Sequence, residues 1–161
     1  MERYTITGAK IISLSDKGTL PEGYLTITNG HIEKMGDMSA FHPDGEDILT
    51  MDGKSILPGL IDSHCHLISA TAHPVTESYI TRSTLEGVEA ARLALEDGLT
   101  SVRDVGCRHG GIYALKEAVE AGQIPGPRFQ TAGRPIFKQF FSRGRPVSIR
   151  SVDLRPVIGS C

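Results

Sequence analysis

Apolar and polar residues alternate through the first third of the chain, and this period of two is typical of half-buried β-strands. Residues rich in Ile, Thr, Leu and Tyr carry the pattern in three runs, over 4–13, 23–36 and 47–57. Asn29 and Gly30 separate "YLTIT" from "HIEKM", and Asn-Gly between two apolar runs indicates a tight hairpin. We therefore expect residues 1–55 to form a small β-rich domain.

Beyond residue 55 the pattern changes to strands that alternate with helices. A helix is expected to begin at Ser83, which can cap it while Glu86 closes a capping box. It should end at Gly98, where a left-handed glycine belongs. Its expected buried stripe consists of Leu85, Val88, Ala91, Ala94 and Leu95.

Two further strands and a second helix complete this region. The runs "LTSVRDVG" and "RFQTAGRPI" have the composition of short strands. Between them, residues 111–122 show a helical period with one apolar face, and Gly122 should end the helix. The order βαβαβ predicts parallel strands and right-handed crossovers, so we expect an α/β fold over residues 56–136.

The stretch "LPGLIDSHCHL", residues 57–67, carries the candidate chemistry. It is expected to be an apolar strand, continuous with residues 55–56 through a Pro-Gly kink, that ends at two histidines. Residues two apart on a strand point the same way, so His64 and His66 should project together. Asp62 would lie on the same side, either supporting a ligand histidine or accepting backbone N–H bonds, and Cys65 would face the other way. Two neutral imidazoles suit a zinc ion, and the alternative is a pair of exposed histidines at a strand end.

Other polar residues follow the expected strands. Asp104 ends the second strand and is either a site residue or the partner of Arg103 or Arg108 in an ion pair. His109 borders the start of the second helix, where backbone N–H groups can bind an anion, although loop flexibility also accounts for the glycines there. His73 lies in the long loop after the first strand and is expected to be solvated.

The composition excludes several classes of protein. Of the 161 residues, 39% are hydrophobic and 22% charged, as in ordinary globular proteins, and a net charge of −2 gives no reason to expect nucleic acid or a membrane surface as partner. The chain has three cysteines, which form no disulfide framework and no CxxC zinc pattern. The expected compartment is the reducing cytoplasm.

Together these residues resemble a known family. "PGLIDSHCHL" is similar to the signature of the amidohydrolase superfamily, whose two histidines bind a catalytic divalent metal at the end of the first strand of a (β/α)8 barrel. The β-rich opening resembles the small β-sandwich-like domain that precedes this barrel in many members. "GLTSVRDVG" and "GPRFQTAGRPI" resemble the second and third barrel strands of the imidazolonepropionase-like and Xaa-Pro-dipeptidase-like branch.

The resemblance implies a metal-dependent hydrolase that acts on C–N bonds of a small-molecule substrate through metal-activated water. His64 and His66 would hold the metal, expected to be zinc. The family's remaining ligands are a lysine or glutamate, two more histidines and an aspartate on later strands, and these have no place here.

The end of the chain departs from the family. Where the branch continues with Thr-Gly-Gly-His-Gly, residues 137–161 carry five basic side chains against a single acid, Asp153. We expect this basic tail to be disordered or out of frame, and the chain to be a truncated, inactive form that self-associates through exposed sheet edges. The alternatives are a non-catalytic metal-binding or dimerisation module, or a small enzyme with a site around Cys107 and His109.

Overall fold

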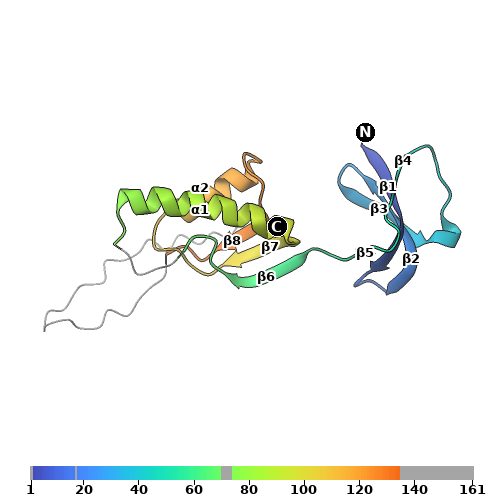
Figure 1. Cartoon of the computed structure of the whole chain (residues 1–161), viewed down its shortest axis with the longest axis horizontal. Coiled ribbons are helices and arrows are strands. Elements are labelled where there is room, and N and C mark those ends of the chain that lie inside the picture. The colour runs from blue at the N-terminus through green and yellow to red at the C-terminus, as the bar shows by residue number, and fades with distance from the viewer. Residues whose placement is uncertain (1, 17, 70–73, 135–161) are drawn as a thin grey trace, which may run out of the picture.

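The computed structural model describes residues 2–16, 18–69 and 74–134, which form two separate sheets (Figure 1). In the first sheet the order is β3-β2-β1-β4, and β5 also pairs with β1. The pairs β1–β2 and β2–β3 are antiparallel, whereas β4 and β5 run parallel to β1. The elements are β1 (Arg3–Ile12), β2 (Thr19–Thr28), β3 (His31–Asp37), the short 3-10 helix η1 (Met38–Ala40), β4 (Asp47–Thr50) and β5 (Ser55–Ile56).

The hairpin between β2 and β3 confirms the prediction from Asn-Gly. Asn29 has a φ of 50° and Gly30 a φ of 76°. Positive φ at both central residues is the mark of a type I′ turn, whose twist matches that of the two strands. Thr28 pairs directly with His31 across this turn.

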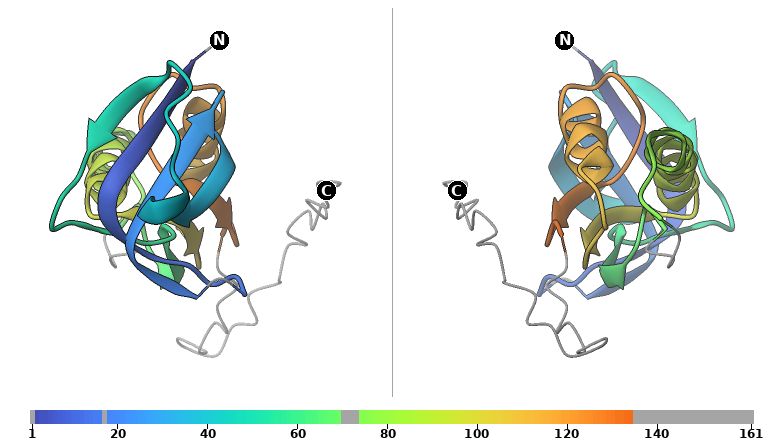
Figure 2. Two further views of the ribbon diagram at one scale, coloured as in Figure 1. Left: turned by 90° about the vertical axis from the view of Figure 1, so that its right-hand side faces the viewer. Right: turned by 90° about the vertical axis from the view of Figure 1, so that its left-hand side faces the viewer.

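The second sheet is parallel, with the order β6-β7-β8, and confirms the expected α/β arrangement. Both helices lie on the same face of it (Figures 1 and 2), and neither has the length and hydropathy of a membrane span. The core between sheet and helices includes Leu67, Ile68, Val102, Ile112, Leu115 and Phe129. The elements are β6 (Leu60–Cys65), α1 (Glu77–Glu96), β7 (Leu99–Asp104), α2 (Gly111–Glu120) and β8 (Arg128–Thr131).

The strand expected over residues 55–66 is in fact two strands in two sheets. Ser55 and Ile56 form β5 beside β1, and β6 begins only at Leu60. The Pro58-Gly59 pair lies in the extended connection between the sheets, where proline provides no N–H group for a ladder. The predicted kink is therefore a change of sheet.

The N-cap of helix α1 lies seven residues earlier than expected. Thr76 is the N-cap, and its side-chain oxygen accepts from the Tyr79 N–H at 3.2 Å. Ser83 is therefore not a cap but a buried residue in the second turn of the helix, and the prediction of a capping box there is wrong. The predicted C-terminal glycine is confirmed, since Gly98 has a φ of 88°.

The buried face of α1 is also rotated from the predicted stripe. Leu85 is 65% exposed and Leu95 37% exposed. On the other side of the helix every fourth residue, from Tyr79 to Ala91, is buried. Gly87 lies so close to the core that a Cβ would approach Ile68 Cγ1 to 2.7 Å. The fully buried residues of α1 are Tyr79, Ser83, Gly87 and Ala91. Val88 is half-buried and packs against the core, so Val88 and Ala91 of the predicted stripe are confirmed.

A histidine explains why a serine faces the core. His109 is 2% exposed, and its Nδ1 accepts from the Gly111 N–H at 3.1 Å, so the ring proton resides on Nε2. Nε2 then donates to Ser83 Oγ at 2.8 Å, and that hydroxyl donates to the Tyr79 carbonyl at 2.7 Å. Both ring nitrogens are satisfied, and the neutral imidazole joins α1 to the start of α2.

We predict that Gly87 and Leu85 respond in opposite ways to substitution. Gly87→Val should lower the free energy of unfolding by about 1–3 kcal/mol, because its side chain overpacks the contact with Ile68. Leu85→Ala should change it by less than about 0.5 kcal/mol, because the leucine is exposed. Urea denaturation of both variants measures this. A loss of about 2–5 kcal/mol in Leu85→Ala would instead support the stripe expected from the sequence.

We further predict that His109 makes folding stability depend on pH. Burial of the ring, and then the positive charge of Arg134, lower the pKa of His109 below its usual 6.5. Between the lowered pKa and about pH 6.5 the unfolded chain binds a proton that the folded chain excludes. The contribution of His109 to the free energy of unfolding should therefore be constant above about pH 6.5 and should fall as the pH drops below that value.

The measurement is the free energy of unfolding from about pH 7.5 to about pH 5 in the original chain and in His109→Gln. The variant should lose about 1–3 kcal/mol throughout, because its buried partners are left unsatisfied, and should show a shallower pH dependence. His42→Gln, an exposed position in the first part of the chain, is the control. Equal slopes in His109→Gln and the original chain would contradict the assignment.

Candidate metal centre

His64 and His66 lie side by side at the carboxyl end of β6. Both are exposed, their ring centroids are 6.0 Å apart, and the rings stand nearly perpendicular at 85°. Cys65 turns to the opposite side, where it packs against the core and its Sγ donates to the Arg103 carbonyl at 3.5 Å. Desolvation, with the nearby carboxylates, raises the pKa of this thiol to about 11, so it stays protonated. The geometry agrees with two histidines on one side and cysteine on the other.

Asp62 does not share the side of the histidines, and this expectation is wrong. Asp62 pairs with Val102, which is buried beneath the helices, and Cys65 pairs with Asp104. Three steps on β6 thus match two on β7, which is a β-bulge, and the alternation of sides is interrupted between residues 62 and 65. The Asp62 carboxylate accepts from the His64 backbone N–H at 2.9 Å. It therefore stabilises the bulge and does not touch the ring of either histidine through any hydrogen bond among the described residues.

The ring of His66 is oriented by a carbonyl. Its Nδ1 lies 2.8 Å from the Gly106 oxygen, which can only accept, so Nδ1 carries the proton and donates. In the neutral ring this leaves the lone pair on Nε2, the nitrogen that is then free to bind a metal. The donor set therefore fits a borderline divalent ion such as zinc.

Asp104 is fully buried at the place where the three strands of the second sheet end. One carboxylate oxygen accepts from the Leu67 N–H at 3.0 Å. The other accepts from the Gly106 N–H at 3.0 Å and from Thr131 Oγ1 at 3.2 Å. These three donors are neutral and belong to the segments after β6, after β7 and at the end of β8. The carboxylate thus joins the three strand ends beside His66.

Two donors alone do not complete a zinc site. Catalytic zinc has three protein ligands and an open position. Within residues 2–16, 18–69 and 74–134, no three His, Cys, Asp or Glu side chains are grouped so that they could hold a metal ion. His73 and the whole basic tail lie outside the residues that the structure describes.

The expected alternative site around Cys107 and His109 is not assembled. Both side chains are buried, and both nitrogens of His109 are engaged with Gly111 and Ser83. Burial also raises the pKa of the Cys107 thiol, which keeps the sulfur a poor nucleophile. The Gly111 N–H, which an anion at the start of α2 would need, is occupied by the histidine ring.

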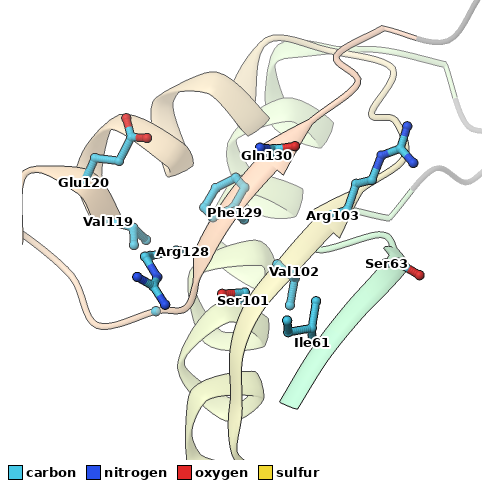
Figure 3. Close-up of a pocket in the computed structure, with 11 residues that line it drawn as sticks. Ile61, Ser63, Ser101, Val102, Arg103, Val119, Glu120, Arg128, Phe129 and Gln130 are labelled. Atoms are coloured by element: carbon cyan, nitrogen blue, oxygen red, sulfur yellow. The ribbon is translucent and has the colours of Figure 1, made fainter. Parts of the chain in front are cut away.

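A pocket of about 690 Å³ extends along the second sheet from β6 to the end of α2 (Figure 3). Its lining includes Ile61 and Ser63 from β6, Ser101 and Arg103 from β7, and Arg128 and Gln130 from β8. Neither His64 nor His66 lines it, so this pocket is not the candidate metal centre.

Sequence reasoning missed two residues that build this centre. Gly106 supplies the carbonyl for His66 and has a φ of 140°, which favours glycine. Thr131 supplies a hydroxyl to Asp104 from β8. Gly106 and Thr131 lie near His66 because the carboxyl ends of parallel strands meet at one edge of the sheet. Polar residues at the strand ends were the feature of the sequence that indicated such a meeting.

The chain is similar in sequence to enzymes of known name. Adenine deaminase from Listeria welshimeri is 34% identical over 85 residues, which are 53% of this chain and 12% of that protein. Dihydroorotase from Geobacillus thermodenitrificans is 38% identical over 56 residues, or 35% of this chain and 13% of the relative. The chain thus matches only a small part of the length of these curated relatives.

Solved structures show the same likeness in three dimensions. The structure of molinate hydrolase superimposes with a TM-score of 0.68 at 26% identity, covering 84% of this chain and 30% of that one. A Xaa-Pro dipeptidase gives a TM-score of 0.69 at 23% identity, over 84% of this chain and 34% of that one, which shows a shared fold. Residues 55–151 match the amidohydrolase family. Because this match extends over more than half of the chain, the protein belongs to the amidohydrolase family.

Proposed function

We propose that this chain forms part of a metal-dependent hydrolase acting on C–N bonds of amide, cyclic amide or dipeptide-like substrates. The observation that carries the proposal is the pair of exposed imidazoles, 6.0 Å apart at the carboxyl end of β6. Ligand sites of parallel α/β proteins lie at this end of the strands. Relatives named adenine deaminase and dihydroorotase support the class of bond.

In this proposal His64 and His66 hold a divalent metal, with zinc as the preferred ion. When bound, such a metal lowers the pKa of a water molecule and polarises the scissile group. The chain's own contribution is orientation. Gly106 fixes the His66 ring through Nδ1, and Asp62 fixes the backbone that carries His64. The remaining ligands and the proton acceptor would come from other parts of a complete site.

We also propose that the second sheet is the beginning of a barrel. Its three strands and two helices would be the first units of a (β/α)8 barrel over residues 56–136, which in complete form takes about 250 residues. Residues 1–55 would be the small accompanying domain, with residues 55–56 reaching back into its sheet. The face that carries Ile61, Ser101 and Arg128 would then line the barrel interior.

Exposed apolar side chains favour a second candidate function, a non-catalytic module that binds metal and associates with another chain. Ile61 is 76% exposed and Leu60 57% exposed on β6, which pairs with β7 alone among the described residues. Parallel sheets are normally covered on both faces, and open edges pair readily with other chains. We therefore propose self-association of the 161-residue chain.

We predict weak zinc binding that needs both histidines. Isothermal calorimetry should detect binding in the original chain and none in His64→Ala/His66→Ala, because two nitrogen donors are removed. The matched control is His42→Ala, an exposed histidine outside the second sheet, which should bind as the original does. Equal affinity in the double variant and the original chain would remove the metal assignment.

We predict no hydrolysis by the 161-residue chain alone, even with excess zinc. The two donors fall short of the three ligands of a catalytic zinc site. A panel of dipeptide, cyclic amide and lactone substrates should show no turnover, and light scattering should show species larger than a monomer. Turnover that chelator abolishes and that His64→Ala lacks would show instead that this chain builds a working site.

A further inference from the structure

We propose that Asp104 is a positioning residue for His66, acting through the backbone of Gly106. This inference rests on the proposed role of His66 as a metal ligand. Asp104 itself would not touch the metal. It would determine which nitrogen of the His66 ring is available and where that nitrogen lies.

Asp104 holds His66 from two directions. One carboxylate oxygen accepts from the N–H of Leu67, the residue that follows His66, at 3.0 Å. The other accepts from the Gly106 N–H at 3.0 Å, and the carbonyl of Gly106 accepts from His66 Nδ1 at 2.8 Å. The carboxylate is thus connected to His66 in two ways. One connection runs through Gly106 to the imidazole ring, and the other runs through the Leu67 N–H to the backbone of His66.

These hydrogen bonds require a carboxylate at position 104, and another polar side chain would not make all of them. Both oxygens of Asp104 receive hydrogen bonds, from Leu67 on one side and from Gly106 and Thr131 on the other. A carboxylate accepts at every one of these positions, whereas an amide would turn an NH2 group toward a donor. Because Asp104 is fully buried, water is not at hand to replace the lost bond.

Gly106 is suited to transmit this constraint. Its φ of 140° is favoured by glycine, and its N–H and carbonyl bind Asp104 and His66 respectively. The Gly106 carbonyl belongs to the following peptide unit, whose Cys107 N–H donates to the Gly133 carbonyl at 2.8 Å. Loss of the Asp104 contact would free the Gly106 N–H and let Gly106 turn about that second anchor, so that its carbonyl no longer holds the proton on Nδ1. The two neutral tautomers of His66 would then both be populated, and the metal would compete with a proton on Nε2.

The test uses the full chain labelled with nitrogen-15 and follows the ring nitrogens of His66 without metal, assigned with His66→Gln. We expect one tautomer, protonated on Nδ1, in the original chain and a mixture in Asp104→Asn. Zinc calorimetry should show affinity reduced by about 10–100-fold in that variant. Asp97→Asn makes the same change at an exposed acid that ends α1 and is the matched control, with the tautomer and zinc affinity of the original chain.

A purely structural role gives a different result. If Asp104→Asn is less stable to urea but keeps the Nδ1-protonated tautomer and the original zinc affinity, the inference is overturned. If Asp104→Asn does not fold, Gly106→Ala takes its place, since it keeps the carboxylate and shifts the backbone N–H and carbonyl that link Asp104 to His66. An unchanged tautomer in that variant overturns the inference as well.

The metal role and the positioning role fail separately. If the original chain binds no zinc, the proposed function is wrong, and the tautomer of the metal-free ring still decides the role of Asp104. If zinc binds and both variants retain the original tautomer, the function stands and the positioning role is wrong.

Discussion

The buried carboxylate of Asp104 is the constraint on which the described part of the second sheet depends. A charge without solvent must be satisfied by donors, and each of its three donors belongs to a different segment. The ends of β6, β7 and β8 are therefore fixed relative to one another at the edge where ligands bind in parallel α/β proteins. The exposed histidines follow from this arrangement, because His66 is the residue just before one of those donors.

A second polar contact organises the helices. His109 and Ser83 are hydrogen-bonded inside the core, so α1 must present a small polar residue to α2 in place of a leucine. Gly87, one turn later, allows the same close approach. Two residues that lower helix propensity thus define the buried face of α1, and its leucines remain partly outside.

The sequence predicted elements wherever local chemistry decides the structure. Asn29-Gly30 requires a tight hairpin, and Gly98 ends a helix because of its own backbone conformation. The βαβαβ order and the side-by-side histidines also follow from local patterns. Prediction failed where a distant partner decides: Ser83 looks like a helix cap until His109 is placed beside it, and Asp62 alternates with His64 until pairing with β7 introduces a bulge. No period along a single strand reveals such an extra residue.

The connection at Pro58-Gly59 also bears on the order in which the chain assembles during synthesis. Ile56 pairs with Ile11, so the first sheet cannot be completed until β5 has left the ribosome, long after β1. Leu60 begins β6 only a few residues later, and its pairing partner β7 is still to be made. The completed first sheet would therefore hold the start of β6 in place, while the segment that carries His64 and His66 remains unpaired until β7 has been synthesised. Co-translational folding of this chain would pass through a stage with one closed sheet and a single unpaired strand, the stage most exposed to capture by a chaperone or by another nascent chain.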